Sequence, residues 1–175
     1  MLLATLAACQ KDRIEVREEP KEDVPSAAAL APASRPRGVH WTAPAGWTEA
    51  AGNGMRIATL TPPKTDGKAE VTVIALPGDV GGELANVNRW RGQLALPPIA
   101  EADLAAARSG VRSGLGALNM YDFTGTGTNK TRLVAGMVSV SGTTWFFKLM
   151  GDEKAVAAAR PAFVKLLEGL NKDAR

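Results

Sequence analysis

Five closely spaced residues carry side chains that could bind a polar ligand. They are Asn86, Asn88, Arg89, Trp90 and Gln93. Asn86, Arg89 and Gln93 stand at positions i, i+3 and i+7, so a helix would place them on one face, with Asn88 to its side. Amides and a guanidinium make directional hydrogen bonds, which suit an anion or a peptide backbone. These residues therefore form a candidate binding site.

The same cluster also has a structural interpretation. Trp90 would pack in the core, while the amides would cap the loop after Gly78 and tie the helix to a sheet, because buried polar groups usually serve structure. The sequence favours this structural role over binding. The substitution Arg89→Ala separates the two: binding is lost without a change in melting temperature if the cluster is functional, and the fold fails if it is structural.

Few residues could support covalent or metal chemistry. The chain has one histidine, His40, and one cysteine, Cys9, so we expect neither the usual zinc sites nor Ser–His–Asp or Cys–His catalysis. A pair of carboxylates acting as in glycosidases stays open, although most acids of the domain fall in polar helix or loop contexts. Residues 125–131 miss the phosphate-loop pattern and predict a hairpin loop. We expect no enzymatic activity, metal or cofactor.

Cys9 has the most specific chemical context in the sequence. It follows Leu6, Ala7 and Ala8, which resembles the lipobox of bacterial lipoproteins, where a branched apolar residue and two small residues precede the modified cysteine. The resemblance implies a diacylglycerol thioether on Cys9, cleavage before it, and acylation of the new amino group. Two or three acyl chains hold a protein stably on a membrane. Residues 1–8 would be the signal peptide, and their shortness indicates a truncated leader or an upstream start.

The residues after Cys9 are those that an anchored protein needs. Residues 9–38 carry mixed charges and then many Pro, Ala and Ser residues, so they offer too little apolar surface to fold and predict a flexible tether. Gln10, rather than Asp, follows the cysteine, which in lipoproteins of two-membrane bacteria implies the outer membrane. The alternative is a cytosolic protein in which Leu-Ala-Ala-Cys is incidental.

Charge and hydropathy exclude other classes of protein. The net charge is +3 and the pI about 9.2, but no basic stripe with stacking aromatic residues is present, so we expect no nucleic-acid binding. No apolar run reaches the roughly 18 residues that a membrane-spanning helix needs. We predict one soluble domain over residues 39–175.

Hydrophobic periodicity predicts an α+β domain. Alternating apolar residues predict strands at 40–42, 55–61, 70–76, 115–125, 131–141 and 143–150. Helical spacing predicts helices at 83–94, 101–108 and 153–170, and Pro161 should kink or restart the last one. The buried stripe of the first helix should consist of Leu84, Val87, Trp90 and Leu94. Ser141 and Gly142 signal a tight hairpin. Strands in groups separated by helices indicate an antiparallel β-sheet covered by helices.

The order of these elements resembles the PsbP-like fold. The domain opens with Trp41-Thr42-Ala43-Pro44-Ala45-Gly46-Trp47, which is similar to the W-x-x-P-x-G-W entry of that group. The resemblance covers residues 39–171 and implies a PsbP-like sandwich. Members of the group are accessory or binding proteins with differing partners, so the resemblance implies no particular ligand.

Two functions follow as expectations. The first is a lipid-anchored, non-enzymatic binding or accessory protein of the bacterial cell envelope, which faces the periplasm from the outer membrane and contacts another envelope protein. The second is a small-ligand-binding protein that uses a polar cleft at the helix of residues 81–94. The sequence predicts neither the identity of the ligand nor the oligomeric state.

Overall fold

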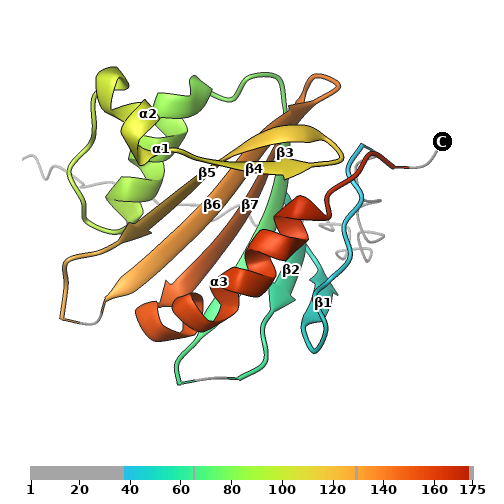
Figure 1. The fold of residues 1–175 in the computed structure, drawn as a ribbon, viewed down its shortest axis with the longest axis horizontal. Helices are drawn as coiled ribbons and strands as arrows, with labels where there is room; N and C mark the ends of the chain where they lie inside the picture. The colour runs from blue at the N-terminus through green and yellow to red at the C-terminus, as the bar shows by residue number, and fades with distance from the viewer. Residues whose placement is uncertain (1–37, 65, 129, 174–175) are drawn as a thin grey trace, which may run out of the picture. The chain divides into compact units, whose positions relative to one another are not determined.

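Residues 38–64, 66–128 and 130–173 are described by a computed structural model, and they form one antiparallel sheet with helices on both faces (Figure 1). The strands are β1 (Thr48–Ala51), β2 (Arg56–Thr61), β3 (Ala69–Pro77), β4 (Ser109–Ser113), β5 (Gly116–Thr124), β6 (Thr131–Val140) and β7 (Thr143–Asp152). The helices are α1 (Gly82–Gln93), α2 (Leu104–Ala107), which a short 3-10 turn (Glu101–Asp103) precedes, and α3 (Glu153–Glu168). The predicted signal peptide, Cys9 and the tether up to residue 37 lie outside the described residues.

The strands lie in the order β1-β2-β3-β7-β6-β5-β4, and each neighbouring pair is antiparallel. The long central strands β3, β7 and β6 therefore pair along their whole length. The predicted hairpin between β6 and β7 is confirmed: Ser141 and Gly142 both have positive φ angles, 50° and 77°, as a two-residue primed turn requires. Helices cover the sheet on both sides, which confirms the predicted α+β class.

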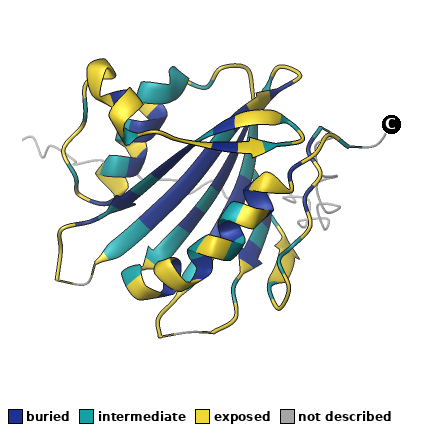
Figure 2. Cartoon of the chain, in the orientation of Figure 1, coloured by how far each residue is buried: buried dark blue, intermediate teal, exposed yellow. Residues whose placement is uncertain are grey.

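Strand alternation divides the core into two layers. Trp145, Phe147 and Leu149 of β7 point to the face that α3 covers, while Phe146 and Met150 point to the face that α1 and α2 cover. Figure 2 shows the buried residues along the central strands and on the inner sides of the helices. Each helix thus buries an apolar stripe against its own face of the sheet.

The first predicted strand, at residues 40–42, is wrong. His40 forms only an isolated bridge, exchanging two backbone hydrogen bonds with Asn171, while its neighbours Val39 and Trp41 are buried among the residues facing α3. The chain instead begins its sheet at β1, and it adds β4 as the opposite edge. Neither edge strand was predicted, because all residues of β1 are exposed and β4 is short, so both lack a clear apolar alternation.

The predicted restart of the helix at Pro161 is also wrong, whereas the alternative, a kink, stays a prediction. Helix α3 runs through this residue without a break. Pro161 is exposed, whereas Ala159 and Phe163 on either side are buried against the sheet. We attribute the continuity to this placement, because packing of the buried face outweighs the one hydrogen bond that proline removes on the solvent side. No helix in the described part of the chain combines the length and apolar character needed to cross a membrane.

Candidate functional site: the groove beside helix α1

Helix α1 lies over the sheet because three of its side chains enter the core. Val87, Trp90 and the following Leu94 are buried, which confirms most of the predicted apolar stripe, and Leu84 is partly buried against the same cluster. The Trp90 ring contacts Tyr121 at 6.0 Å and Phe146 at 6.3 Å between centroids. The position of α1 is therefore fixed by the apolar packing of its inner face.

Asn86 fixes the entry into the helix. It is 1% exposed, and its Nδ2 donates to the backbone oxygens of Val80 at 2.8 Å and Gly82 at 2.7 Å. Gly81 and Gly82 have φ angles of 76° and 72°, a conformation that glycine adopts without strain. The amide thus satisfies carbonyls of a tight turn, as the structural interpretation expected of this cluster.

A groove of about 120 Å³ lies between α1 and strands β3 and β7. Its walls contain the apolar side chains of Ile74, Leu76, Trp90 and Phe146. Its polar side chains come from all three elements, and they are Thr72, Asn86, Arg89, Gln93 and Lys148. Hereafter this set of nine residues is called the α1 groove.

The structure brings four of the five predicted site residues to the α1 groove: Asn86, Arg89, Trp90 and Gln93. Asn88 lies elsewhere, because its side chain donates to the backbone oxygen of Ile99 at 3.0 Å and accepts from the Ile99 nitrogen at 2.8 Å. It therefore fastens the loop that follows α1. Trp90 and Asn86 are chiefly buried, so the accessible polar groups of the helix are Arg89 and Gln93.

Two cations of the α1 groove are held by amide oxygens. Arg89 Nη1 donates to Asn86 Oδ1 at 2.7 Å, and Lys148 Nζ donates to Gln93 Oε1 at 3.1 Å. Burial, and then the nearby charge of Arg56, lower the pKa of Lys148, while Glu70 acts in the opposite direction. Lys148 is only partly buried, but a partly desolvated ammonium near another cation is electrostatically less favourable than a solvated one, and a bound anion would relieve this.

Thr72 and Lys148 line the groove, but neither was among the site residues predicted from the sequence. Thr72 is 5% exposed, and its hydroxyl oxygen has no hydrogen-bond partner in the described part of the chain. Thr72 and Lys148 stand directly opposite each other in the pairing of β3 with β7. A lysine within the apolar run of residues 143–150 was a visible signal, but its partner could not be named without the strand register.

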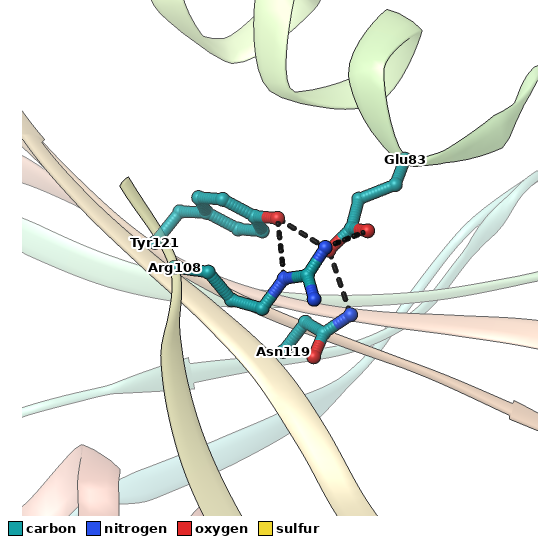
Figure 3. A network of polar contacts seen from close by, with 4 residues as sticks. All are labelled: Glu83, Arg108, Asn119 and Tyr121. Carbon is teal, nitrogen blue, oxygen red and sulfur yellow. Dashed lines mark hydrogen bonds and ion pairs between the residues drawn. The ribbon is translucent and has the colours of Figure 1, made fainter. Parts of the chain in front are cut away.

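A carboxylate network ties the first turn of α1 to the sheet (Figure 3). Glu83 Oε1 accepts from Asn119 Nδ2 at 2.6 Å and from the Tyr121 hydroxyl, and its Oε2 accepts from Arg108 Nη2 at 2.7 Å. Burial first, and then the hydrogen bond to Glu83, raise the pKa of Tyr121 to about 12.

Both oxygens of Glu83 are occupied, so we assign this network a positioning role for α1. Sequence reasoning missed it, although Asn119 and Tyr121 alternate as polar residues on one face of a predicted strand. In the described residues no group of three or more His, Cys, Asp or Glu side chains is arranged to hold a metal ion.

The fold defines the class of the domain: it is an α+β domain in which an antiparallel sheet lies between helical layers. The α1 groove lies between one of these layers and the sheet. Solved structures share this architecture at low identity. Cyanobacterial PsbP (CyanoP) from Synechocystis sp. PCC 6803 matches with a TM-score of 0.50 and 14% identity, over 78% of this chain and 87% of that one. A protein from Bacteroides thetaiotaomicron VPI-5482 matches with a TM-score of 0.50 and 11% identity, over 78% of this chain.

The match spans only 46% of the Bacteroides chain. LpqN, which is involved in cell envelope biogenesis of Mycobacterium tuberculosis, superposes with a TM-score of 0.48 and 12% identity, over 78% of this chain and 83% of that one. No family model matches the sequence, and no curated protein does. At these identities the likeness shows the fold alone, so the domain has a PsbP-like fold and its function must be argued from its own residues.

Proposed function

We propose that this chain is a lipid-anchored, non-enzymatic binding protein of the bacterial cell envelope. The anchor is supported by the lipobox-like residues before Cys9, and the presentation of the domain is supported by the tether of residues 9–38. The orientation toward the periplasm from the outer membrane rests on Gln10. The binding role rests on one observation, the α1 groove, where two cations are held by neutral amides beside a buried hydroxyl without a partner.

Acyl labelling tests the anchor. Cells that express the native gene are grown with an alkyne fatty acid, and the protein is then isolated and coupled to a fluorophore. We expect label on the wild-type protein, none on Cys9→Ala, and recovery of the wild-type protein in the outer-membrane fraction. An unlabelled wild-type protein, or a label that persists in Cys9→Ala, would contradict the anchor.

The ligand of the groove is either a small molecule or a segment of an envelope protein. The buried hydroxyl of Thr72 favours the small molecule, because a group this deep is reached more readily by a small ligand than by a protein surface. Expression without the anchor, as Cys9→Ala, provides material for thermal-shift measurements against a panel of charged and neutral metabolites.

The expected result is a rise in melting temperature with at least one compound in the parent protein and no rise in Arg89→Ala. Arg112→Ala is the matched control, because Arg112 is an exposed arginine on β4. A panel without any Arg89-dependent ligand, together with envelope pull-downs that are identical for Arg89→Ala and its parent, would refute binding at the groove.

A further inference from the structure

Hydrogen-bond donors outnumber acceptors in the α1 groove. A lysine ammonium has three N–H donors and a guanidinium has five, yet Lys148 and Arg89 each have a single hydrogen-bond acceptor in the described chain. The Thr72 hydroxyl has none. By contrast, Arg108, Arg132 and Arg160 each pair with a carboxylate. The groove therefore presents N–H and O–H donors for which the described residues supply few oxygen acceptors.

The donors converge because sheet register and helical spacing bring them together. Thr72 and Lys148 are a cross-strand pair, and such neighbours have Cβ atoms about 5 Å apart. Arg89 and Gln93 are one turn apart on α1, and the bond from Lys148 to Gln93 joins the helix to the strands. An anion at this point would meet donors from three separate elements.

Electrostatics favours an anion at this point. None of the residues that line the groove is acidic. The nearest carboxylate known to affect Lys148, that of Glu70, is already 3.6 Å from Arg56. Arg56 and Glu70 largely neutralise each other, so Lys148 and Arg89 give the groove a positive potential that a cation or a neutral ligand would leave unbalanced.

Size and apolar walls set the remaining character of the ligand. A volume of about 120 Å³ is close to an engineered cavity of about 150 Å³ that holds benzene. The groove therefore accommodates one charged group and a few carbon atoms rather than a whole large metabolite. Ile74 and Leu76 are partly exposed and supply an apolar surface for those carbons.

We propose that the α1 groove binds an oxyanion group, a carboxylate or a phosphate, carried on a small apolar body. Lys148 and Arg89 neutralise its charge, the Thr72 hydroxyl donates the third hydrogen bond, and Gln93 and Asn86 hold the two cations in place. The proposal rests on the binding role proposed above and adds the chemical class of the ligand.

Titration with simple probes tests this class. Butyrate, inorganic phosphate and the neutral isostere butyramide are titrated at constant ionic strength into ¹⁵N-labelled full chain carrying Cys9→Ala, and amide chemical shifts are followed. Butyrate and phosphate should shift residues of α1, β3 and β7 with saturation, and butyramide should not. Equal binding of butyramide and butyrate, or no saturable shift with either anion up to tens of millimolar, overturns the proposal.

Substitutions of Lys148 and Thr72 test whether these side chains bind the anion. Lys148→Gln should weaken butyrate binding at least tenfold, Thr72→Val several-fold, and Lys148→Arg much less than Lys148→Gln. Lys165→Gln, which removes an exposed charge from α3, should change nothing. Thr72→Val is informative even if Lys148→Gln fails to fold, because the Thr72 hydroxyl has no hydrogen-bond partner to lose among the described residues. Unchanged affinity in both Thr72→Val and Lys148→Gln overturns the proposal.

A third experiment distinguishes two sources of such an anion, which are a lipid headgroup and a free small molecule. Vesicles of phosphatidylcholine, with or without phosphatidylglycerol, are co-sedimented with the protein. Lys148-dependent binding to the anionic vesicles alone identifies a headgroup, and butyrate binding without vesicle binding identifies a free anion; either result supports an oxyanion site. Neutral metabolites that stabilise the protein through Arg89 would instead sustain the proposed binding function and reject its anionic class.

Discussion

Asn86→Asp replaces the amide NH2 group of a buried side chain of α1 by an oxygen atom. The amide Nδ2 donates to two backbone oxygens, at 2.8 and 2.7 Å, in a side chain that is 1% exposed. The introduced carboxylate would place an oxygen against both carbonyls, although its other oxygen could still accept from Arg89. The substitution therefore removes the two hydrogen bonds from the side chain to the turn at the start of α1, while it conserves the shape of the side chain.

The expected loss of stability follows from these two bonds. The Val80 oxygen loses its donor, whereas the Gly82 oxygen keeps the backbone N–H of residue 86 within α1. A buried acceptor left without its donor costs about 1–3 kcal/mol, and the new carboxylate also repels both carbonyl oxygens, so we expect a loss of about 3 kcal/mol at pH 7. For a domain of this size that corresponds to about 10 °C in melting temperature. The loss should shrink as the pH falls through the pKa of the introduced carboxyl, because the protonated acid can donate again.

Urea denaturation followed by circular dichroism measures this difference at pH 7 and at pH 4. Asn53→Asp makes the same change at an exposed position of the β1–β2 turn and should alter stability by less than about 0.5 kcal/mol. An Asn86→Asp protein as stable as the Asn53→Asp control at pH 7 would refute the role assigned to Asn86.

Two further predictions follow from the polar networks on each face of the sheet. Tyr121 is the only tyrosine and has a pKa raised to about 12 by burial and then by Glu83, so tyrosinate absorbance should appear only above about pH 11, and Glu83→Gln should lower the midpoint; a wild-type midpoint near 10 contradicts the Glu83 network. Burial opposes ionisation of Asp122, but the hydrogen bonds from Arg132 and Arg160 outweigh it and lower the pKa of this carboxyl. Its stabilisation is therefore present above the unfolded pKa near 4 and lost as the pH falls through the folded pKa. Asp122→Asn should cost about 2 kcal/mol at pH 7, less than a fully buried pair because Arg160 is partly exposed. The difference from wild type in urea denaturation should narrow toward pH 2, and a constant difference across that range contradicts the assignment.

The sequence predicted those elements whose buried faces carry apolar residues at regular spacing. The alternation in residues 131–140 predicted β6 and its two faces, because both faces of that strand are covered by helices. The spacing of Val87, Trp90 and Leu94 predicted α1 for the same reason. β1 escaped prediction because its four residues are all exposed and carry no such pattern.

The groove was predictable only in part. Helical spacing placed Arg89 and Gln93 on one face of a helix, and both residues line the groove. The other side depends on the pairing of β3 with β7, which sets Thr72 opposite Lys148. Since register between strands distant in sequence is decided by tertiary packing, a single sequence could not supply it. Asn86 and Asn88 fasten the helix, as the structural interpretation expected, whereas Arg89 and Gln93 line the groove, where ligand binding stays a prediction.

The protonation of Lys148 tests the oxyanion site most directly. Its side-chain resonance, assigned by comparison with Lys148→Arg, is titrated by NMR with and without saturating butyrate. Without butyrate the pKa of Lys148 should lie below that of an ordinary lysine, because the side chain is partly buried and the charge of Arg56 is nearby. With butyrate it should rise, because a bound anion stabilises the charged form. A Lys148 pKa that butyrate leaves unchanged would contradict an oxyanion at this ammonium and with it the ligand class proposed for the groove.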